Sequence, residues 1–135
     1  MQKMLIYFSL FLVLGMSSCS LFSDDGDLFN VTFKNESSEN ITDIEFYAII
    51  NDGDGSVNSY VSPITKDSIG SGESFSSSLD FSSSPACDGQ YVFEYTYSGE
   101  EYSTTFGYYT GGGPAYNYDN LILTINGETF SGEYE

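Results

Sequence analysis

The chain has 135 residues, a formal net charge of −17 and neither histidine nor arginine. Because proteins bind phosphate backbones chiefly through lysine and arginine, this composition argues against nucleic acid as a partner and against direct attraction to an anionic membrane surface. Without histidine, serine and cysteine nucleophiles lose their usual base and zinc loses its commonest nitrogen ligand. We therefore expect that the protein is not an enzyme and binds no cofactor.

Residues 1–18 have the order of a secretory signal peptide. Lys3 supplies a positive charge, Met4 to Gly15 is an uncharged apolar run, and the small residues Ser17 and Ser18 follow. A bilayer span needs about 20 apolar residues, so this shorter run does not predict a permanent transmembrane helix. The sequence predicts export from the cytoplasm.

The segment Met16-Ser17-Ser18-Cys19 resembles the lipobox of bacterial lipoproteins, although that family most often has leucine where Met16 stands. The resemblance implies that Cys19 is diacylated on sulfur and becomes the new N-terminus, which would anchor the protein in a membrane. The alternative is an unlipidated secreted protein in which Cys19 lies near an ordinary cleavage site. An acylated Cys19 leaves no internal disulfide for Cys87, so stability would then depend on a packed core.

Residues 19–27, here called the tether, are small and end in acidic side chains. Such a segment has too little apolar surface to order itself. It resembles the acidic segment after the lipid cysteine in surface-exposed lipoproteins of Bacteroidota, which implies an outer-membrane lipoprotein displayed on the cell exterior. The other interpretation is a spacer that holds the domain away from the membrane.

Residues 28–135 form one expected domain, in which apolar and polar side chains alternate with the period of β-strands. We expect a first hairpin from Leu28 to Asn35 and from Asp43 to Ile50, joined by a turn at 36–40. The other expected strands lie within 57–73 and at 74–81, 90–98, 101–110, 121–125 and from 128 onward. Seven or eight short strands favour an antiparallel β-sandwich, with a small barrel as the alternative.

Asn126-Gly127 is the strongest hairpin pattern in the chain, because a type I′ turn requires positive φ at both central residues. A two-residue loop at these positions pairs Ile125 with Glu128 and Leu123 with Phe130. That register places Leu123 and Phe130 on the same face, as a shared core requires.

Three short segments resemble small Bacteroidota lipoproteins that carry immunoglobulin-like or transthyretin-like sandwich domains. They are Gly70 to Phe75, Asp88 to Tyr91 and Phe106 to Gly111. The resemblance implies a sandwich fold and a location in the cell envelope. It implies no catalytic residue.

Asn51 to Ser56 contains the aspartates and glycines of a calcium loop. An EF-hand that starts at Asp52 fails, since Val57 stands where glycine is needed and Pro63 where the bidentate glutamate belongs. A looser calcium site made by turn carboxylates stays open beside the simpler interpretation of an ordinary turn.

Tyrosine is unusually abundant, with 12 residues in the chain. Half of any alternating set should face the core, but exposed rings beside carboxylates suit stacking on sugars or a protein interface. We expect a non-catalytic binding or structural domain that recognises a protein partner, or alternatively a glycan-binding accessory of a nutrient-uptake system. The candidate ligand-binding aromatics are Tyr95, Tyr97, Tyr102, Tyr108, Tyr109, Tyr116 and Tyr118.

Overall fold

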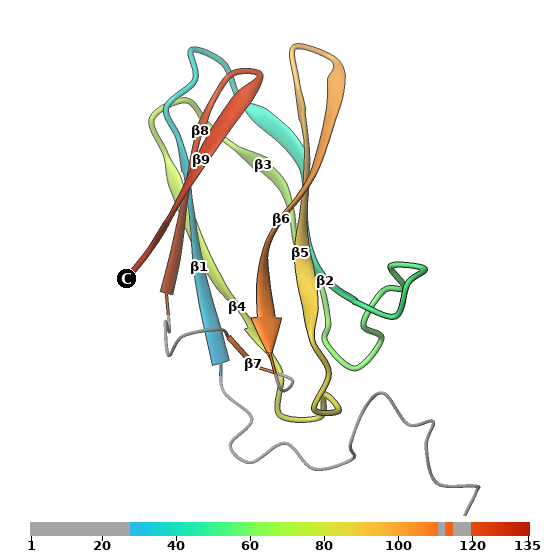
Figure 1. The fold of residues 1–135 in the computed structure, drawn as a ribbon. Helices are drawn as coiled ribbons and strands as arrows, with labels where there is room; N and C mark the ends of the chain where they lie inside the picture. Colours follow the sequence, from blue (N-terminus) through green and yellow to red (C-terminus); the bar gives the residue numbers. More distant parts are fainter. Residues whose placement is uncertain (1–27, 111–112, 115–119) are drawn as a thin grey trace, which may run out of the picture.

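A computed structural model describes residues 28–110, 113–114 and 120–135, which form two β-sheets facing each other (Figure 1). The predicted signal peptide, the predicted tether with Cys19, and the candidates Tyr116 and Tyr118 lie outside the described residues. The strands are β1 Leu28–Asn35, β2 Ile41–Ile50, β3 Ile64–Ile69, β4 Ser74–Asp80, β5 Gly89–Tyr97, β6 Glu100–Thr110, β7 Gly113–Pro114, β8 Asn120–Asn126 and β9 Thr129–Tyr134.

One sheet has the order β4-β1-β8-β9 and the other has the order β3-β2-β5-β6-β7. Eight of these strands have six residues or more, so the predicted β-sandwich of seven or eight strands is confirmed. Among the described pairs only β1 and β8 run parallel, which makes the four-stranded sheet mixed. The described residues include no helix that is long and apolar enough to cross a membrane.

The predicted hairpin between the first two strands is wrong, because β1 and β2 lie in different sheets. The buried side chain of Asn35 explains the crossing. Its Nδ2 donates to the carbonyl oxygens of Glu39 at 2.9 Å and Ile69 at 3.0 Å, and its Oδ1 accepts from the Ser37 amide at 2.9 Å. These hydrogen bonds hold the connection in a conformation that crosses from the sheet of β1 to the sheet of β2, so the chain does not form a hairpin within one sheet.

Aromatic rings fill the space between the sheets. Phe29 and Phe33 on β1 are completely buried, as the alternation predicts. The Phe33 ring lies 5.6 Å from that of Phe93 on β5, and Phe46 on β2 stacks 5.4 Å from Tyr91. Since burying one large apolar side chain stabilises a fold by about 1.5–3 kcal/mol, these rings account for much of the cohesion between the sheets.

A bulge in β2 changes the alternation that the sequence predicts. Asp43 has a φ of 51°, and the pairing with β5 shifts between Thr42 and Glu45. As a result Ile41 and Ile44, three residues apart, both face the core. The bulge also projects the Asp43 side chain towards solvent on the outer face.

The hairpin between β8 and β9 exists, but its predicted register is wrong by two residues. Asn126 pairs with Thr129 and Ile125 with Phe130, so Gly127 and Glu128 form the turn. A φ of 67° at Gly127 fits a type II′ turn, which needs positive φ at its first central residue only. A shift of two residues keeps every side chain on its face, so alternation cannot detect it.

Candidate functional site

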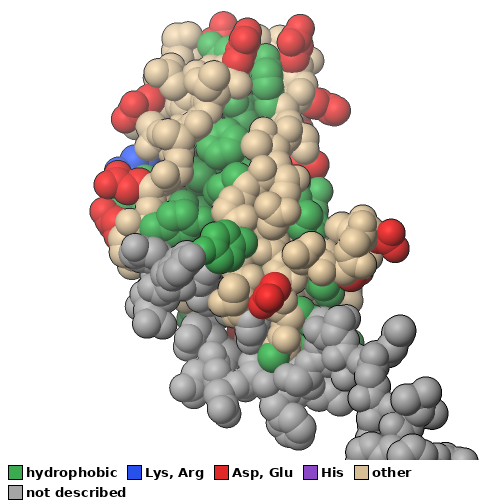
Figure 2. Space-filling model, in the orientation of Figure 1, with side chains coloured by type: hydrophobic (Ala, Val, Ile, Leu, Met, Phe, Trp, Pro, Cys, Tyr) green, Lys and Arg blue, Asp and Glu red, His purple; other side chains and the backbone are tan. Residues whose placement is uncertain are grey.

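The candidate functional site lies between β6 and β9, neighbouring edges of the two sheets along which the described residues add no further long strand. β9 pairs with β8 on one side, and β6 pairs with β5 along its length but with β7 only at Tyr109 and Thr110. Figure 2 shows hydrophobic side chains at the surface between the two sheets in this view. We call the aromatic residues along this opening the β6–β9 seam: Tyr95, Tyr102, Phe106 and Phe130.

The rings of the seam continue the aromatic core outwards. Phe130 lies 5.1 Å from Phe93 and 5.3 Å from Phe106, edge to face in both cases. Tyr102 stacks on Tyr95 at 5.3 Å with 22° between the ring planes. Tyr95 is buried, whereas Tyr102, Phe106 and Phe130 are half-buried. The seam therefore leaves parts of the Tyr102, Phe106 and Phe130 rings exposed to solvent.

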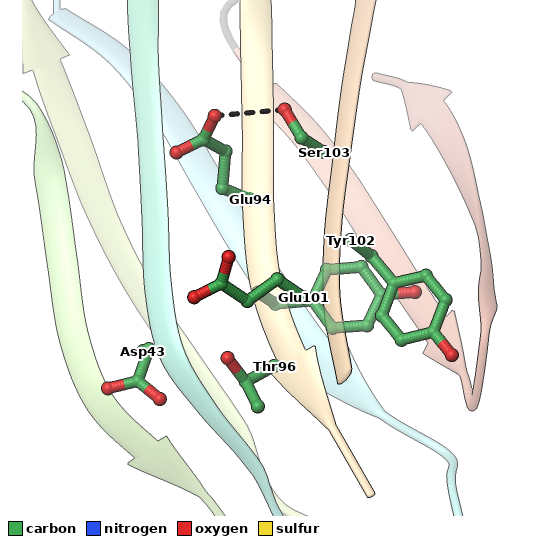
Figure 3. A pocket seen from close by; sticks show the side chains of 7 residues that line it. Asp43, Glu94, Thr96, Glu101, Tyr102 and Ser103 are labelled. Carbon is green, nitrogen blue, oxygen red and sulfur yellow. Dashed lines mark hydrogen bonds between the residues drawn. The ribbon is translucent and has the colours of Figure 1, made fainter. Parts of the chain in front are cut away.

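An acidic hollow of about 270 Å³ lies on the outer face of β2, β5 and β6. Figure 3 shows the carboxylates of Asp43, Glu94 and Glu101 on this face, with Glu101 reaching towards β2. Ser103 Oγ donates to Glu94 Oε1 at 2.9 Å, and the Tyr47 hydroxyl donates to the same oxygen at 3.3 Å. The described residues that line the hollow include no lysine.

Negative charge also accumulates on the strands around the hollow. Glu45 pairs directly with Glu94 across the strands, an arrangement of like charges that destabilises a sheet. Burial raises the pKa of Tyr47 above its usual value, and the neighbouring charge of Glu94 raises it further. A cation placed on this face would relieve the repulsion.

Four turns meet at one end of the sandwich and make that end acidic. They connect β1 with β2, β3 with β4, β5 with β6, and β8 with β9. Figure 2 shows carboxylates gathered at this end, which is uppermost in the view. We call this group the acidic end; its carboxylates belong to Glu36, Glu39, Glu73, Glu100, Glu101 and Glu128.

Hydrogen bonds between turns hold the acidic end together. Ser98 Oγ donates to Glu39 Oε2 at 2.9 Å, and the Gly127 amide donates to Ser37 Oγ at 2.7 Å. Burial raises the pKa of Tyr102, and the charges of Glu128 and Glu100 raise it further. The tyrosine ring therefore sits in a negative field where the acidic end meets the seam.

Comparisons with known proteins assign no family. No protein-family model and no curated protein matches the chain. Among solved structures it is similar to an NMR structure of a protein from Eubacterium rectale, with 19% sequence identity and a TM-score of 0.46. The similarity covers 78% of this chain and 82% of that one. At this level it supports no argument about function.

The structure separates the five candidate tyrosines that it describes. Tyr95 and Tyr109 are 3% and 0% exposed, so their assignment to an exposed ligand-binding surface is wrong. Tyr97 and Tyr102 are half-buried, and Tyr108 is 43% exposed. Alternation predicted which strand positions face inward, but it could not show that the space between the sheets accommodates whole tyrosine side chains.

Sequence reasoning missed a buried polar cluster around Asn58. Its Nδ2 donates to Ser84 Oγ at 2.9 Å and to the Tyr109 hydroxyl at 3.2 Å. The Tyr109 hydroxyl donates in turn to the carbonyl oxygen of Ile49 at 2.9 Å. Asn58 lies in the segment 57–73, whose sequence has no clear alternation. An asparagine in such a segment looks like an ordinary surface loop residue, so its burial could not be predicted.

The Asn51 to Ser56 segment is a turn in which the Asp52 carboxylate accepts hydrogen bonds from the backbone amides that follow it. Its Oδ1 accepts from the amides of Asp54 at 3.1 Å, Gly55 at 3.0 Å and Ser56 at 3.4 Å. Hydrogen bonding, first from the Ser56 side chain, lowers the pKa of Asp52. The described residues include no group of three or more histidine, cysteine, aspartate or glutamate side chains that could hold a metal ion.

Cys87 is 2% exposed and is disulfide-bonded. This differs from the expectation that Cys87 has no disulfide partner if Cys19 is acylated. The sequence contains one other cysteine, Cys19, which lies outside the described residues. A sulfur that forms a disulfide cannot also be acylated, so an internal bond between the two cysteines and a lipid on Cys19 exclude each other in one molecule.

Proposed function

We propose that this protein is a lipid-anchored protein of the cell envelope whose β-sandwich binds a protein partner and performs no catalysis. The predicted signal peptide and the lipobox resemblance around Cys19 support the anchor, which requires that Cys19 in the mature protein carries acyl chains and forms no disulfide with Cys87. The observation that carries the binding function is the β6–β9 seam, where half-buried aromatic rings lie at open strand edges. Aromatic side chains are enriched in protein interfaces, and open strand edges are templates for pairing with another chain.

The orientation of the domain suits this function. The described chain begins at Leu28, at the end of the sandwich opposite the acidic end (Figure 1). A tether of nine residues reaches at most about 30 Å when fully extended. Anchored through Cys19, the domain would turn its acidic end away from the membrane, and an anionic membrane surface would favour the same orientation by repulsion.

A glycan-binding role has less support. It depended on a row of exposed tyrosine rings beside carboxylates, and two of the seven candidate rings, Tyr95 and Tyr109, are in the core. The half-buried rings of the seam lie between two strand edges, where only part of each ring is exposed. That geometry suits the side chains of a protein better than the broad face of a sugar ring.

Site-directed photo-crosslinking in the cells that produce the protein tests the proposal. A photo-reactive amino acid at Thr104, which is exposed on β6, should crosslink to a discrete protein. The matched control places the same amino acid at Asp67, which is exposed on β3 at the other edge of the same sheet. Equal crosslinking from both positions, or none from Thr104, would overturn the proposal.

A further inference from the structure

The edge of β6 that faces away from β5 is free to accept an additional strand, as far as the described part of the chain shows. From Glu101 to Phe106, β6 pairs with β5 on one side, and no described strand pairs with its other side. Tyr102 to Phe106 is uncharged and contains no proline or lysine, the residues that commonly protect edges. On β3, the opposite edge of this sheet, Lys66 and Asp67 supply such charges, and Lys66 Nζ lies 5.1 Å from the Phe75 ring.

One face of an added strand would meet the seam. Tyr102, Thr104 and Phe106 pair with the core residues of β5 and therefore point inward. Thr104 is nevertheless exposed, because the small side chain stands between two larger rings at the open edge. Across the opening, the Phe130 ring lies 5.3 Å from that of Phe106. Side chains entering here would be apolar or aromatic, since they would cover half-buried rings.

The other face of an added strand would meet the acidic hollow. Glu101, Ser103 and Thr105 alternate with the inward residues and point to the outer face. Ser103 is bonded to the Glu94 carboxylate, and Asp43 completes the negative lining. A long cationic side chain beside Ser103 could extend across one strand towards Glu94. Lysine or arginine would therefore complement this face.

We propose that β6 accepts an extended segment of a partner protein as an added strand, and that this segment alternates apolar or aromatic residues with lysine or arginine. The inference rests on the proposed protein-binding function and specifies the chemistry of the partner. A second copy of this chain fits poorly, because each copy has a formal charge of −17 and its β6 begins with Glu100 and Glu101. The two faces of β6 thus favour different side chains at alternate positions of the added strand, which is how strand addition achieves specificity.

A synthetic peptide tests this inference on the mature protein in mild detergent. The probe is an acetylated eight-residue peptide that alternates lysine with valine and phenylalanine. Binding is followed by NMR through the amide signals of the ¹⁵N-labelled protein. We expect the largest shifts from Glu101 to Phe106 and an affinity at least tenfold above that of the same peptide with glutamate in place of lysine. N-methylation of the peptide backbone should also reduce binding at least tenfold.

Variants of the protein separate the two faces. Thr104→Lys places a charge in the seam, and Glu101→Lys reverses a charge on the outer face. Each variant should bind the lysine peptide at least tenfold more weakly than the unchanged protein does. Thr65→Lys, at an exposed position of β3, adds the same charge at the other edge and should leave binding within twofold. Unchanged amide dispersion in each variant shows that the sandwich is intact.

Several outcomes would overturn the strand-acceptor inference. They are equal binding of the glutamate peptide, equal loss in Thr65→Lys and Thr104→Lys, shifts confined to β9, or no binding of the lysine peptide. The inference would also be overturned if the protein self-associated and Thr104→Lys abolished that self-association, because the added strand would then come from a second copy of this chain. If crosslinking at Thr104 still captures a discrete protein, the proposed function stands while this account of the partner fails.

Discussion

The hydroxyl of Tyr95 donates a 2.9 Å hydrogen bond to the carbonyl oxygen of Gly127, and this bond connects the two sheets. Tyr95 belongs to β5, whereas Gly127 belongs to the turn between β8 and β9. The same ring stacks 5.1 Å from Phe93 and 5.3 Å from Tyr102. Tyr95 thus fixes the distance between the sheets where the seam meets the acidic end.

Tyr95→Phe should lower the free energy of unfolding by about 1 kcal/mol, because it removes one hydrogen bond and retains the ring. Urea unfolding followed by circular dichroism measures the change. Tyr60→Phe is the matched control, since Tyr60 is 54% exposed, and it should change stability by less than about 0.5 kcal/mol. Equal effects of the two substitutions would show that the bond to Gly127 contributes nothing.

The protein should lose stability at alkaline pH. Burial raises the pKa of Tyr95 to about 12, and burial also raises the pKa values of Tyr91 and Tyr109. An unfolded tyrosine ionises near pH 10, so the contribution of these groups is fully present below about pH 10. It is lost as the pH rises through the folded values, because the unfolded chain then releases protons that the folded chain retains.

Absorbance at 295 nm and circular dichroism, recorded together from pH 8 to 13, check this expectation. Some tyrosines should ionise near pH 10, and the buried ones should ionise only as the sandwich unfolds. If every tyrosine ionised near pH 10 with the sandwich intact, the burial described above would be wrong. In Tyr95→Phe, one tyrosine fewer should ionise together with unfolding.

Asn58→Ala should destabilise the fold by about 1–3 kcal/mol, because it leaves buried partners without their hydrogen bonds. Asn58 is completely buried and bonds to both Ser84 and Tyr109. Asn40→Ala, in the exposed turn between β1 and β2, is the control and should be nearly neutral. Thermal unfolding of both variants at pH 7 provides the comparison, and similar melting temperatures would contradict the structural role of Asn58.

Two glycines should differ sharply in their tolerance of alanine. Gly99 has a φ of 82° with open space around it, so Gly99→Ala should cost about 1–2 kcal/mol from backbone strain alone. At Gly89 a Cβ would collide with the carbonyl oxygen of Ile49 and with the Tyr109 ring. Gly89→Ala should therefore prevent native folding, visible as lost amide dispersion. A native spectrum from Gly89→Ala would contradict the close approach of β2 and β5.

Mass spectrometry of the mature protein, isolated from the cells that produce it, tests the proposed lipid on Cys19. We expect an N-terminal peptide that carries acyl chains on Cys19, and Cys19→Ala should abolish labelling by a fatty-acid analogue. A mature protein with an intact bond between Cys19 and Cys87 would contradict the anchor. Labelling that persists in Cys19→Ala would contradict it as well.

Alternation in the sequence predicted most strand positions, because a sheet with one buried face requires a period of two. It could not distinguish a hairpin from a crossing between sheets, since the decision at residues 36–40 depends on Asn35 bonding to Ile69, far away in sequence. It could not fix the register of β8 and β9 either. A shift of two residues leaves both Leu123 and Phe130 on the inner face.

The candidate site was only partly predictable. The sequence identified the density of tyrosine but not which rings are buried, because that depends on how far apart the sheets lie. The seam exists because β6 and β9 are neighbouring edges, and no local pattern reports the order of strands in a sheet. Tyr97 and Tyr102 were correctly placed on strands, but alternation could not reveal that Tyr97 meets Ser38 or that Tyr102 stacks on Tyr95.

The position of β1 determines how the domain would respond to mechanical force. β1 is the first described strand after the tether, and it is held between β4 and β8 in the interior of its sheet. Tension between a membrane anchor and a partner bound to β6 would pull along the axis of β1. Its hydrogen bonds to both neighbours, from Leu28 to Asn35, would then share the tension in shear instead of opening one at a time. The first strand is thus well placed to resist unfolding while the protein is held at both ends.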